Sequence, residues 1–244
     1  MLNDDRNSFY KSKFIEDPSW SSIYPNLDES IRAGTILPYI SEIAERHYAK
    51  NQTPLRIIDV GCGRGWLTSL LTNYGHVVGI EPIEDVTKYA KALYPNIQFV
   101  TATPSSYLED PTFAPFDLVV CTEVIEHVAR ERKLEFLNDL SRMITEQGNI
   151  IITSPRGELF ALWKRLSIPS QPIEDWLTES NLLNLAESCG LIAYKSDRCR
   201  EFNFYKPAEK LLPQYLLKKV LLYLGYRDTD SMIYQVVWLR KCIS

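Results

Sequence analysis

The feature that most constrains this chain is an apolar run, Leu55 to Val60, that leads directly into a turn with glycine at every second position from 61 to 65. Glycine lets the backbone approach a ligand closely, because it has no side chain and tolerates positive φ. A second apolar run ends at Glu81, about 20 residues after Asp59, the offset at which a carboxylate binds ribose hydroxyls in nucleotide-binding βαβ units. The two segments together predict a site for a nucleotide-like cofactor.

Two familiar nucleotide-binding motifs do not fit this turn. A dinucleotide fingerprint requires its third glycine where Trp66 stands, and an indole ring there would obstruct the packing of helix against strand. A P-loop requires Gly-Lys-Ser/Thr, and no such ending follows Gly65. The spacing therefore disfavours an NAD enzyme and excludes an ATP site of the P-loop type.

The pattern Asp-x-Gly-x-Gly-x-Gly, with a following strand that ends in glutamate, resembles motif I and the acidic partner of class I S-adenosylmethionine (SAM)-dependent methyltransferases. The resemblance implies SAM as the cofactor, with Glu81 at the ribose and the backbone of Cys121 near the sulfonium. The cofactor-binding residues that it implies are Asp59, Gly61, Cys62, Gly63, Gly65, Glu81, Pro82, Ala102, Thr103 and Cys121.

Apolar runs with strand and helix periodicity alternate along the middle of the chain, which predicts an α/β fold with a parallel sheet. The resemblance implies that two later runs complete a Rossmann-like, seven-stranded, mostly parallel sheet with an antiparallel last strand and helices on both faces. Strands are expected near 55–60, 76–81, 97–101, 116–121, 149–153, 191–199 and 232–239. Helices are expected near 30–49, 65–74, 83–94, 130–145 and 178–189.

The length and composition fit one α/β domain over residues 1–244, which the resemblance implies is a methyltransferase domain. Within it we expect a SAM-binding core over 30–203 and the last strand over 229–244. Residues 1–29 are rich in aromatics and are expected to form either a lid over the cofactor or an arm packed on the sheet or on a neighbouring subunit. Residues 204–228 read as an amphipathic helical insertion, which suits a substrate cap, a dimer surface or a peripheral membrane contact.

A second string of polar residues, Glu123-Val124-Ile125-Glu126-His127, follows an apolar run that ends at Cys121. It resembles the string of ubiquinone-biosynthesis O-methyltransferases and part of the magnesium-binding motif of small-RNA 2′-O-methyltransferases. On a helical turn, Glu123, Glu126 and His127 would share one face.

Three roles remain open for that face. His127 can act as a general base, the three side chains can bind a divalent cation such as Mg²⁺, or Glu126 and His127 can cap a turn by bonding to backbone. Val128 follows His127 and the other two histidines come earlier in the chain, so a metal is not favoured. We expect His127 and Glu123 to be catalytic and assign no metal ligands. The expected substrate-binding residues are Glu126, Arg156, Trp163 and Trp176.

With a net charge of −4, a general affinity for nucleic acid is not expected, because a phosphate backbone attracts basic proteins. The five cysteines form no C-x-x-C pair and no zinc-ligand spacing, which suits a reducing compartment. No apolar run reaches the length of a membrane span. We therefore expect a cytoplasmic protein that acts on a small molecule, with a homodimer or a peripheral membrane contact as the further partners.

Taken with the resemblance, these residues predict an enzyme that transfers a methyl group from SAM to a hydroxyl oxygen of a small or lipid-linked metabolite of the phenol or quinone type. A sugar or glycan O-methyltransferase of a polysaccharide or natural-product pathway is the alternative within the same class. The non-enzymatic alternative is a regulatory or assembly subunit that binds SAM without turnover.

Overall fold

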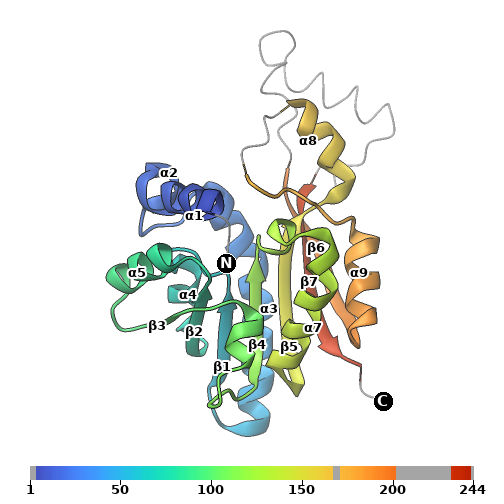
Figure 1. Cartoon of the computed structure of the whole chain (residues 1–244). Coiled ribbons are helices and arrows are strands. Elements are labelled where there is room, and N and C mark those ends of the chain that lie inside the picture. The colour runs from blue at the N-terminus through green and yellow to red at the C-terminus, as the bar shows by residue number, and fades with distance from the viewer. Residues whose placement is uncertain (1–3, 167–170, 202–231, 243–244) are drawn as a thin grey trace.

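The computed structural model describes residues 4–166, 171–201 and 232–242. Within these ranges, seven strands form one sheet in the order β3-β2-β1-β4-β5-β7-β6 (Figure 1). Strand β7 pairs antiparallel with both of its neighbours, and the pairs among β1 to β5 are parallel. The predicted Rossmann-like sheet with an antiparallel last strand is confirmed. The strands are β1 (Leu55–Val60), β2 (Gly75–Glu81), β3 (Gln98–Thr101), β4 (Phe116–Thr122), β5 (Ile144–Pro155), β6 (Leu191–Glu201) and β7 (Met232–Lys241).

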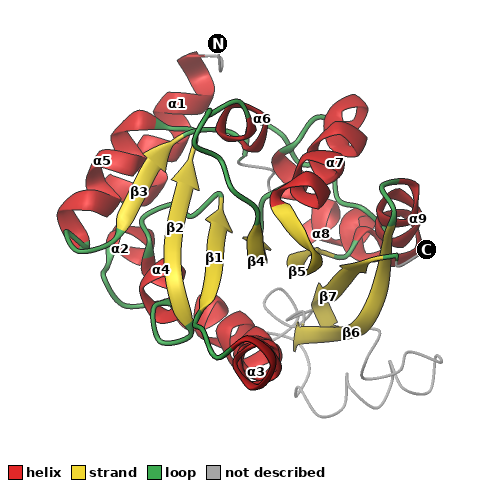
Figure 2. Cartoon of the chain, turned by 90° about the horizontal axis from the view of Figure 1, so that it is seen from below, coloured by secondary structure: helices red, strands yellow, loops and turns green. Residues whose placement is uncertain are grey.

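Helices lie on both faces of this sheet (Figure 2). All five expected helices are present, although residues 130–132 form a separate 3₁₀ turn ahead of α7. Four short helices, α1, α2, α6 and α8, were not expected, because a helix of one or two turns has too few residues to show a period. The helices are α1 (Asp4–Lys11), α2 (Pro18–Ser21), α3 (Leu27–Asn51), α4 (Trp66–Leu71), α5 (Glu84–Leu93), α6 (Pro104–Leu108), α7 (Lys133–Met143), α8 (Phe160–Leu166) and α9 (Glu179–Ser188).

Alternate residues of the central strands pack into two separate apolar cores. In β4, Val119 and Cys121 pack with α7 and α9, whereas Leu118 and Val120 pack with α3 and α4 on the other face. All four side chains are fully buried. This alternation is what a strand covered on both faces requires, since successive side chains point to opposite sides.

Helix α3 begins with a capping box. The backbone N–H of Glu29 donates to the side chain of Asn26 at 3.0 Å, and the carboxylate of Glu29 accepts from the backbone N–H of Asn26 at 2.8 Å. These contacts satisfy two backbone donors that a helix start leaves without intrahelical partners. The helix therefore starts three residues before its expected position and brings Glu29 to the first turn.

Two parts of the expected layout differ or lie outside the described ranges. Strand β5 begins at Ile144, five residues earlier than expected, because Ile144 pairs with Phe116 across a register shift. The expected helical insertion at 204–228 lies outside the described residues. Its attachment points are described: Glu201 and Met232 are register partners in the β6–β7 pair.

The parallel strands β1, β2 and β4 end at the same edge of the sheet, and helices α1, α2 and α8 lie beyond that edge (Figure 1). This is the edge at which open α/β sheets bind ligands, next to the point where the strand order reverses. Here β1 pairs with β2 on one side and with β4 on the other, so the reversal lies at β1.

Candidate active site

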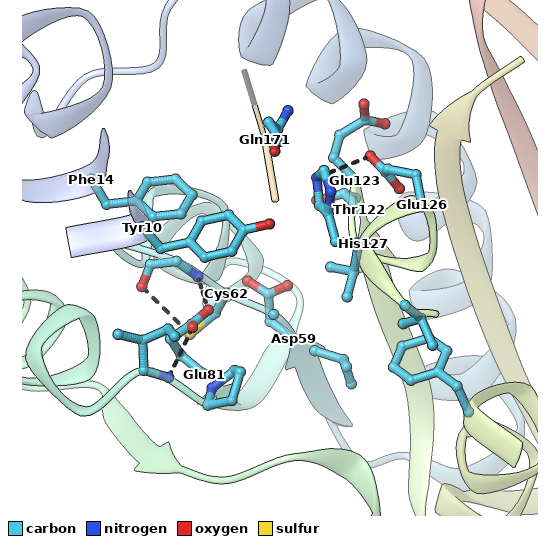
Figure 3. A pocket seen from close by; sticks show the side chains of 18 of the residues that line it. Tyr10, Phe14, Asp59, Cys62, Glu81, Thr122, Glu123, Glu126, His127 and Gln171 are labelled. Carbon is cyan, nitrogen blue, oxygen red and sulfur yellow. Dashed lines mark hydrogen bonds and ion pairs between the residues drawn. The ribbon is translucent and has the colours of Figure 1, made fainter. Parts of the chain in front are cut away.

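A cavity of about 430 Å³ opens at this edge of the sheet (Figure 3). Its walls come from the glycine turn after β1, the ends of β2 and β4, the N-terminal segment, α8 and the loop before α9. The predicted site residues that line it are Asp59, Gly61, Cys62, Gly63, Glu81, Pro82, Ala102, Thr103, Glu123, Glu126, His127, Trp163 and Trp176.

The glycine turn has the positive φ angles that its sequence predicts. Gly61, Gly63 and Gly65 have φ of +70°, +53° and +84°. A Cβ at Gly61 would lie 2.4 Å from a methyl of Val124, so the turn packs tightly against the loop after β4. A Cβ at Gly63 would lie 3.3 Å from the ring of Phe14, in the N-terminal segment. The glycine turn therefore lies against both the loop after β4 and the N-terminal segment.

Glu81 is fixed at the end of β2 by backbone donors. Its carboxylate accepts hydrogen bonds from the N–H of Gly63 at 3.2 Å and from the N–H of Ile83 at 3.1 Å. Burial raises the pKa of Glu81 to about 7, against the lowering effect of these two donors. The carboxylate is thus rigidly held beside the glycine turn, where it can accept hydroxyl donors from a ligand.

Asp59 is a second buried acid, and it lines the cavity together with Glu81. Its carboxylate accepts a hydrogen bond from the hydroxyl of Thr68 at 2.6 Å. Burial raises the pKa of Asp59 to about 7, and the bond from Thr68 opposes the rise. Two buried carboxyl groups in one cavity favour a ligand that carries hydroxyl donors or a positive charge, because either stabilises the ionised form.

The helical turn that was expected over Glu123, Glu126 and His127 is not formed as such. Glu123 has a φ of +56°, and only residues 125–127 form a 3₁₀ turn. The hydroxyl of Thr153 donates to the carboxylate of Glu123 at 2.8 Å and holds it against β5. The three side chains nevertheless line the same cavity, where Figure 3 shows them opposite Tyr10.

Glu123 and Glu126 are both buried acids. Burial raises the pKa of Glu126 well above its usual range, and the neighbouring Glu123 raises it further. Burial likewise raises the pKa of Glu123, which Arg32 opposes. Burial thus raises the pKa of both carboxyl groups at this end of the cavity.

The ring of His127 bridges two loops. Its Nδ1 lies 2.9 Å from the carbonyl oxygen of Ile173. A carbonyl oxygen only accepts hydrogen bonds, so the ring proton is assigned to Nδ1. The other ring nitrogen can then accept a proton as a base. That nitrogen, Nε2, lies 3.7 Å from a carboxylate oxygen of Glu126, which is longer than a hydrogen bond.

Aromatic side chains form two walls of the cavity. On one side, the rings of Trp163 and Trp176 lie 4.9 Å apart, and the indole N–H of Trp176 donates to Glu174 at 2.7 Å. On the other side, the ring of Tyr10 lies edge-on to His127 at 5.9 Å, next to Phe14. The two tryptophans were expected here from the sequence.

Among the charged residues that line the cavity without having been predicted are three that interact electrostatically with one another or with Glu123. Arg32 projects from α3, is 5% exposed and lies over the ring of Tyr234 at 4.9 Å. Among the described residues, no hydrogen-bond partner faces its Nε. Lys13 places its amine 4.4 Å from the ring of Trp20, and burial lowers its pKa against the effect of Glu126 and Glu174. Glu174 is the third. No local motif marks these residues.

Three predicted site residues lie elsewhere, since none is among the residues that line the cavity. Arg156 is buried, forms an ion pair with Glu179 at 3.0 Å and donates to the carbonyl of Met232, so it holds the loop after β5 against α9 and β7. Cys121 is fully buried in an apolar core. Gly65 permits helix packing, because a Cβ there would lie 2.6 Å from Phe99.

Across residues 4–166, 171–201 and 232–242, no group of three or more His, Cys, Asp or Glu side chains is arranged to hold a metal ion. In the same part of the chain, no helix is both long enough and apolar enough to cross a membrane.

The sequence matches the family described as a methyltransferase domain over residues 30–194. Ubiquinone biosynthesis O-methyltransferase of Rickettsia akari (strain Hartford) is 33% identical over 123 residues, which are 48% of this chain and 47% of that protein. The chain thus spans about half the length of this relative. An uncharacterized methyltransferase of Alkaliphilus oremlandii (strain OhILAs) is 26% identical over 185 residues, 75% of this chain and 72% of that protein.

Solved structures share the fold. Magnesium protoporphyrin IX methyltransferase from Synechocystis PCC 6803, with bound SAM, superposes with a TM-score of 0.59 over 99% of both chains. The identity is 13%, so this similarity concerns the arrangement of strands and helices.

Proposed function

The chain belongs to the methyltransferase-domain family, and on that premise we propose that it transfers the methyl group of SAM to a hydroxyl oxygen of a small or lipid-linked metabolite of the phenol or quinone type. One observation carries the proposal. A cavity with a rigid carboxylate beside a glycine turn at one end has a histidine and two buried carboxyl groups at the other. The first end suits a ribose, and the second suits removal of a hydroxyl proton.

In the cofactor half, Glu81 binds the ribose diol and the glycine turn lies along the methionine portion. Glu81 is held in place for this role, because its carboxylate accepts a hydrogen bond from the N–H of Gly63 at 3.2 Å. The sulfonium charge of SAM suits the buried Asp59, whose ionised form a nearby cation favours. Arg32, a buried cation in the same cavity, is the partner for the carboxylate of the methionine portion.

In the acceptor half, His127 removes the hydroxyl proton. SAM supplies a methyl group already activated on sulfur, so the protein must orient the acceptor and accept one proton. The contact from Nδ1 to Ile173 fixes the ring, and Nε2 is assigned the role of the base. Glu126, 3.7 Å from Nε2, stabilises the imidazolium that forms. Glu123 shares this end of the cavity and tunes the charge of Glu126.

The aromatic walls favour an acceptor with a flat ring. Trp163 and Trp176 on one side and Tyr10 on the other leave apolar and π surfaces for such a ring. A phenol also loses its proton far more readily than a sugar hydroxyl, with a pKa of about 10, which suits a single histidine base. The similarity to ubiquinone biosynthesis O-methyltransferases supports the same class of acceptor.

The test uses the purified chain and SAM with an isotopically labelled methyl group. The acceptors are a catechol with a short prenyl chain, its monomethyl ether, its dimethyl ether, a reducing sugar and a primary amine. We expect label on the catechol, less on the monomethyl ether and none on the dimethyl ether, which lacks a free hydroxyl. Binding of S-adenosylhomocysteine is measured by calorimetry in parallel.

The other outcomes are informative. Label on the sugar alone would replace the phenol proposal with the glycan alternative, and label on the amine alone would overturn oxygen methylation. Tight binding of S-adenosylhomocysteine without transfer to any of these acceptors would favour a regulatory subunit. Failure to bind it at all would overturn the cofactor assignment.

A further inference from the structure

Four consecutive carbonyl oxygens, from the last residue of α2 into the link to α3, accept hydrogen bonds from side chains of the glycine turn and of the α5 region. This stretch, residues 21–24, links the aromatic N-terminal segment to the rest of the chain. The four bonds are Tyr89 Oη to Ser21 O at 2.8 Å, Arg64 Nε to Ser22 O at 2.5 Å, Tyr94 Oη to Ile23 O at 2.9 Å and Arg64 Nη2 to Tyr24 O at 3.2 Å.

Arg64 is the centre of this arrangement. It belongs to the glycine turn, and its side chain is fully buried. Its two terminal nitrogens bind both carboxylate oxygens of Glu29, at 2.6 and 2.8 Å, in the bidentate geometry that arginine favours. Glu29 also closes the capping box at the start of α3. One residue of the cofactor turn thus fixes both the linking stretch and the helix that follows it.

The linking stretch is recognised through its backbone. Ile23 and Tyr24 are 46% and 76% exposed, so their side chains contribute little to the attachment. Backbone recognition at four successive residues fixes the path of the chain whatever the side chains are. The partners are Arg64 in the glycine turn, Tyr89 in α5 and Tyr94 at the C-terminal end of α5.

Upstream of this point, the attachments are weaker. Lys11 pairs with Asp85 at 3.0 Å, but both side chains are about half exposed, and such surface pairs contribute little. Phe14 packs beside Gly63 and Tyr10 beside His127, so the segment reaches both halves of the cavity. The position of these aromatic side chains therefore depends on where residues 21–24 are held.

We propose that Arg64, Glu29, Tyr89 and Tyr94 form a carbonyl clasp that positions the N-terminal segment over the bound cofactor. Their role is positioning: the clasp sets Phe14 and Tyr10 against the site, so that cofactor affinity depends on it. The proposal rests on the SAM site proposed above. It differs from a purely structural role, which would change the stability of the fold and leave the affinity of the folded protein unchanged.

The cleanest test removes only two hydroxyls. Tyr89 and Tyr94 do not line the cavity, and the carbonyls of residues 21 and 23 can bind water when the hydroxyls are lost. In the double variant Tyr89→Phe/Tyr94→Phe we expect the Kd for S-adenosylhomocysteine to rise roughly tenfold, the effect of losing two ordinary hydrogen bonds. Hydrogen exchange on residues 7–20 should lose the protection that S-adenosylhomocysteine gives the unaltered protein. The control is Lys11→Gln, which should leave both readouts unchanged.

The charged pair is tested by removing both partners. Arg64→Met alone would leave the Glu29 carboxylate buried without its partner, so that variant is expected to unfold readily. The double variant Arg64→Met/Glu29→Gln removes both charges and keeps an acceptor for the capping box. We expect it to fold and to bind S-adenosylhomocysteine more weakly than the tyrosine variant does.

The outcomes separate this proposal from the proposed function. If the unaltered protein fails to bind S-adenosylhomocysteine, the cofactor assignment fails. If it binds, and both folded double variants bind with unchanged Kd and unchanged ligand-induced protection of residues 7–20, the clasp has no positioning role and the proposal is overturned.

Discussion

The two halves of the cavity are built in different ways. The cofactor half comes from neighbouring stretches of one βαβ unit, and backbone N–H groups fix its key carboxylate. The acceptor half gathers Tyr10, His127, Trp163 and Glu174 from segments far apart in the sequence, and side chains make most of its contacts. A site formed by backbone groups depends on where its glycines and strands lie. A site formed by side chains can be altered by replacing one residue at a time. The first half is therefore expected to be sensitive to backbone change, and the second to the loss of single functional groups.

The largest effect is expected in the acceptor half. His127→Ala should reduce methyl transfer by roughly 10²–10⁴-fold, because it removes the proposed base. The Kd for S-adenosylhomocysteine should stay within a few-fold, since the proton step concerns the acceptor. Steady-state rates and calorimetry on the same preparation check the two quantities.

The matched experiment for His127 concerns metal. If Glu123, Glu126 and His127 bind a divalent cation, then EDTA should abolish transfer until Mg²⁺ is restored, and Glu123→Ala should be about as damaging as the histidine change. Full activity in His127→Ala, Glu123→Ala and Glu126→Ala would remove both the base and the metal roles.

The next effect concerns Gly61, where the glycine turn packs against Val124 in the loop after β4. Gly61→Ala should lower the free energy of unfolding by about 2–4 kcal/mol, because it combines an unfavourable positive φ with an overpacked contact against Val124. Gly34→Ala is the control. Gly34 lies inside α3 with open space around it, so alanine there should raise stability by about 0.5–1 kcal/mol. Urea unfolding measures both free energies, and equal stabilities of the two variants would contradict the predicted overpacking of residue 61 against Val124.

A smaller effect is expected from Glu81 in the cofactor half. Glu81→Ala should weaken the binding of S-adenosylhomocysteine by about 1.5–3 kcal/mol, through the loss of charge-assisted hydrogen bonds to the ribose. Glu81→Gln keeps the shape of the side chain and one acceptor oxygen, so it should bind with intermediate affinity. Calorimetry that gives the alanine variant an unchanged Kd would refute the ribose assignment.

The smallest effect is a pH dependence of the same binding. The pKa values of Asp59 and Glu81 are both raised to about 7, so each carboxyl is partly protonated near neutral pH. Ribose hydroxyls and the sulfonium favour the ionised forms, so affinity for SAM should rise several-fold between about pH 6 and about pH 8. Glu81→Gln should flatten this rise. Calorimetry across the pH series checks it, and an affinity that falls with pH would contradict the argument.

The same raised pKa values act in the opposite direction on the protein without ligand. Because the folded pKa of each group lies above its unfolded value, the neutral form stabilises the fold at low pH. That contribution is lost as pH rises from about 4 to about 7. Bound SAM should offset this loss, so the difference in thermal stability with and without the cofactor should widen with pH.

The fold and the cofactor half were largely predictable from local sequence. Each strand from β1 to β4 is an apolar run, and Asp59, Gly61, Gly63 and Glu81 occupy fixed offsets from strand ends. Their roles depend on the turn in which they stand, and a turn is a local property. The family prediction made from these residues is confirmed by the domain match over 30–194.

The acceptor half was predictable only in part, because its residues meet through tertiary structure. Lys13 and Arg32 carry no local signal, and only the packing of the N-terminal segment and α3 brings them to the cavity. Arg156 follows β5 as expected, but its guanidinium pairs with Glu179 in α9, and Arg156 is not among the residues that line the cavity. The predicted helical face around Glu126 failed because Glu123 has positive φ.

The pairing of Glu201 with Met232 closes the end of the β6–β7 pair at the point where the chain leaves the sheet. The chain leaves β6 and re-enters β7 at adjacent positions on the cavity edge, where Ile233 and Tyr234 line the site. Residues between these points can be lengthened, shortened or exchanged without shifting the register of the sheet. A change in the length or sequence of that segment would therefore leave the strands and the glycine turn in place.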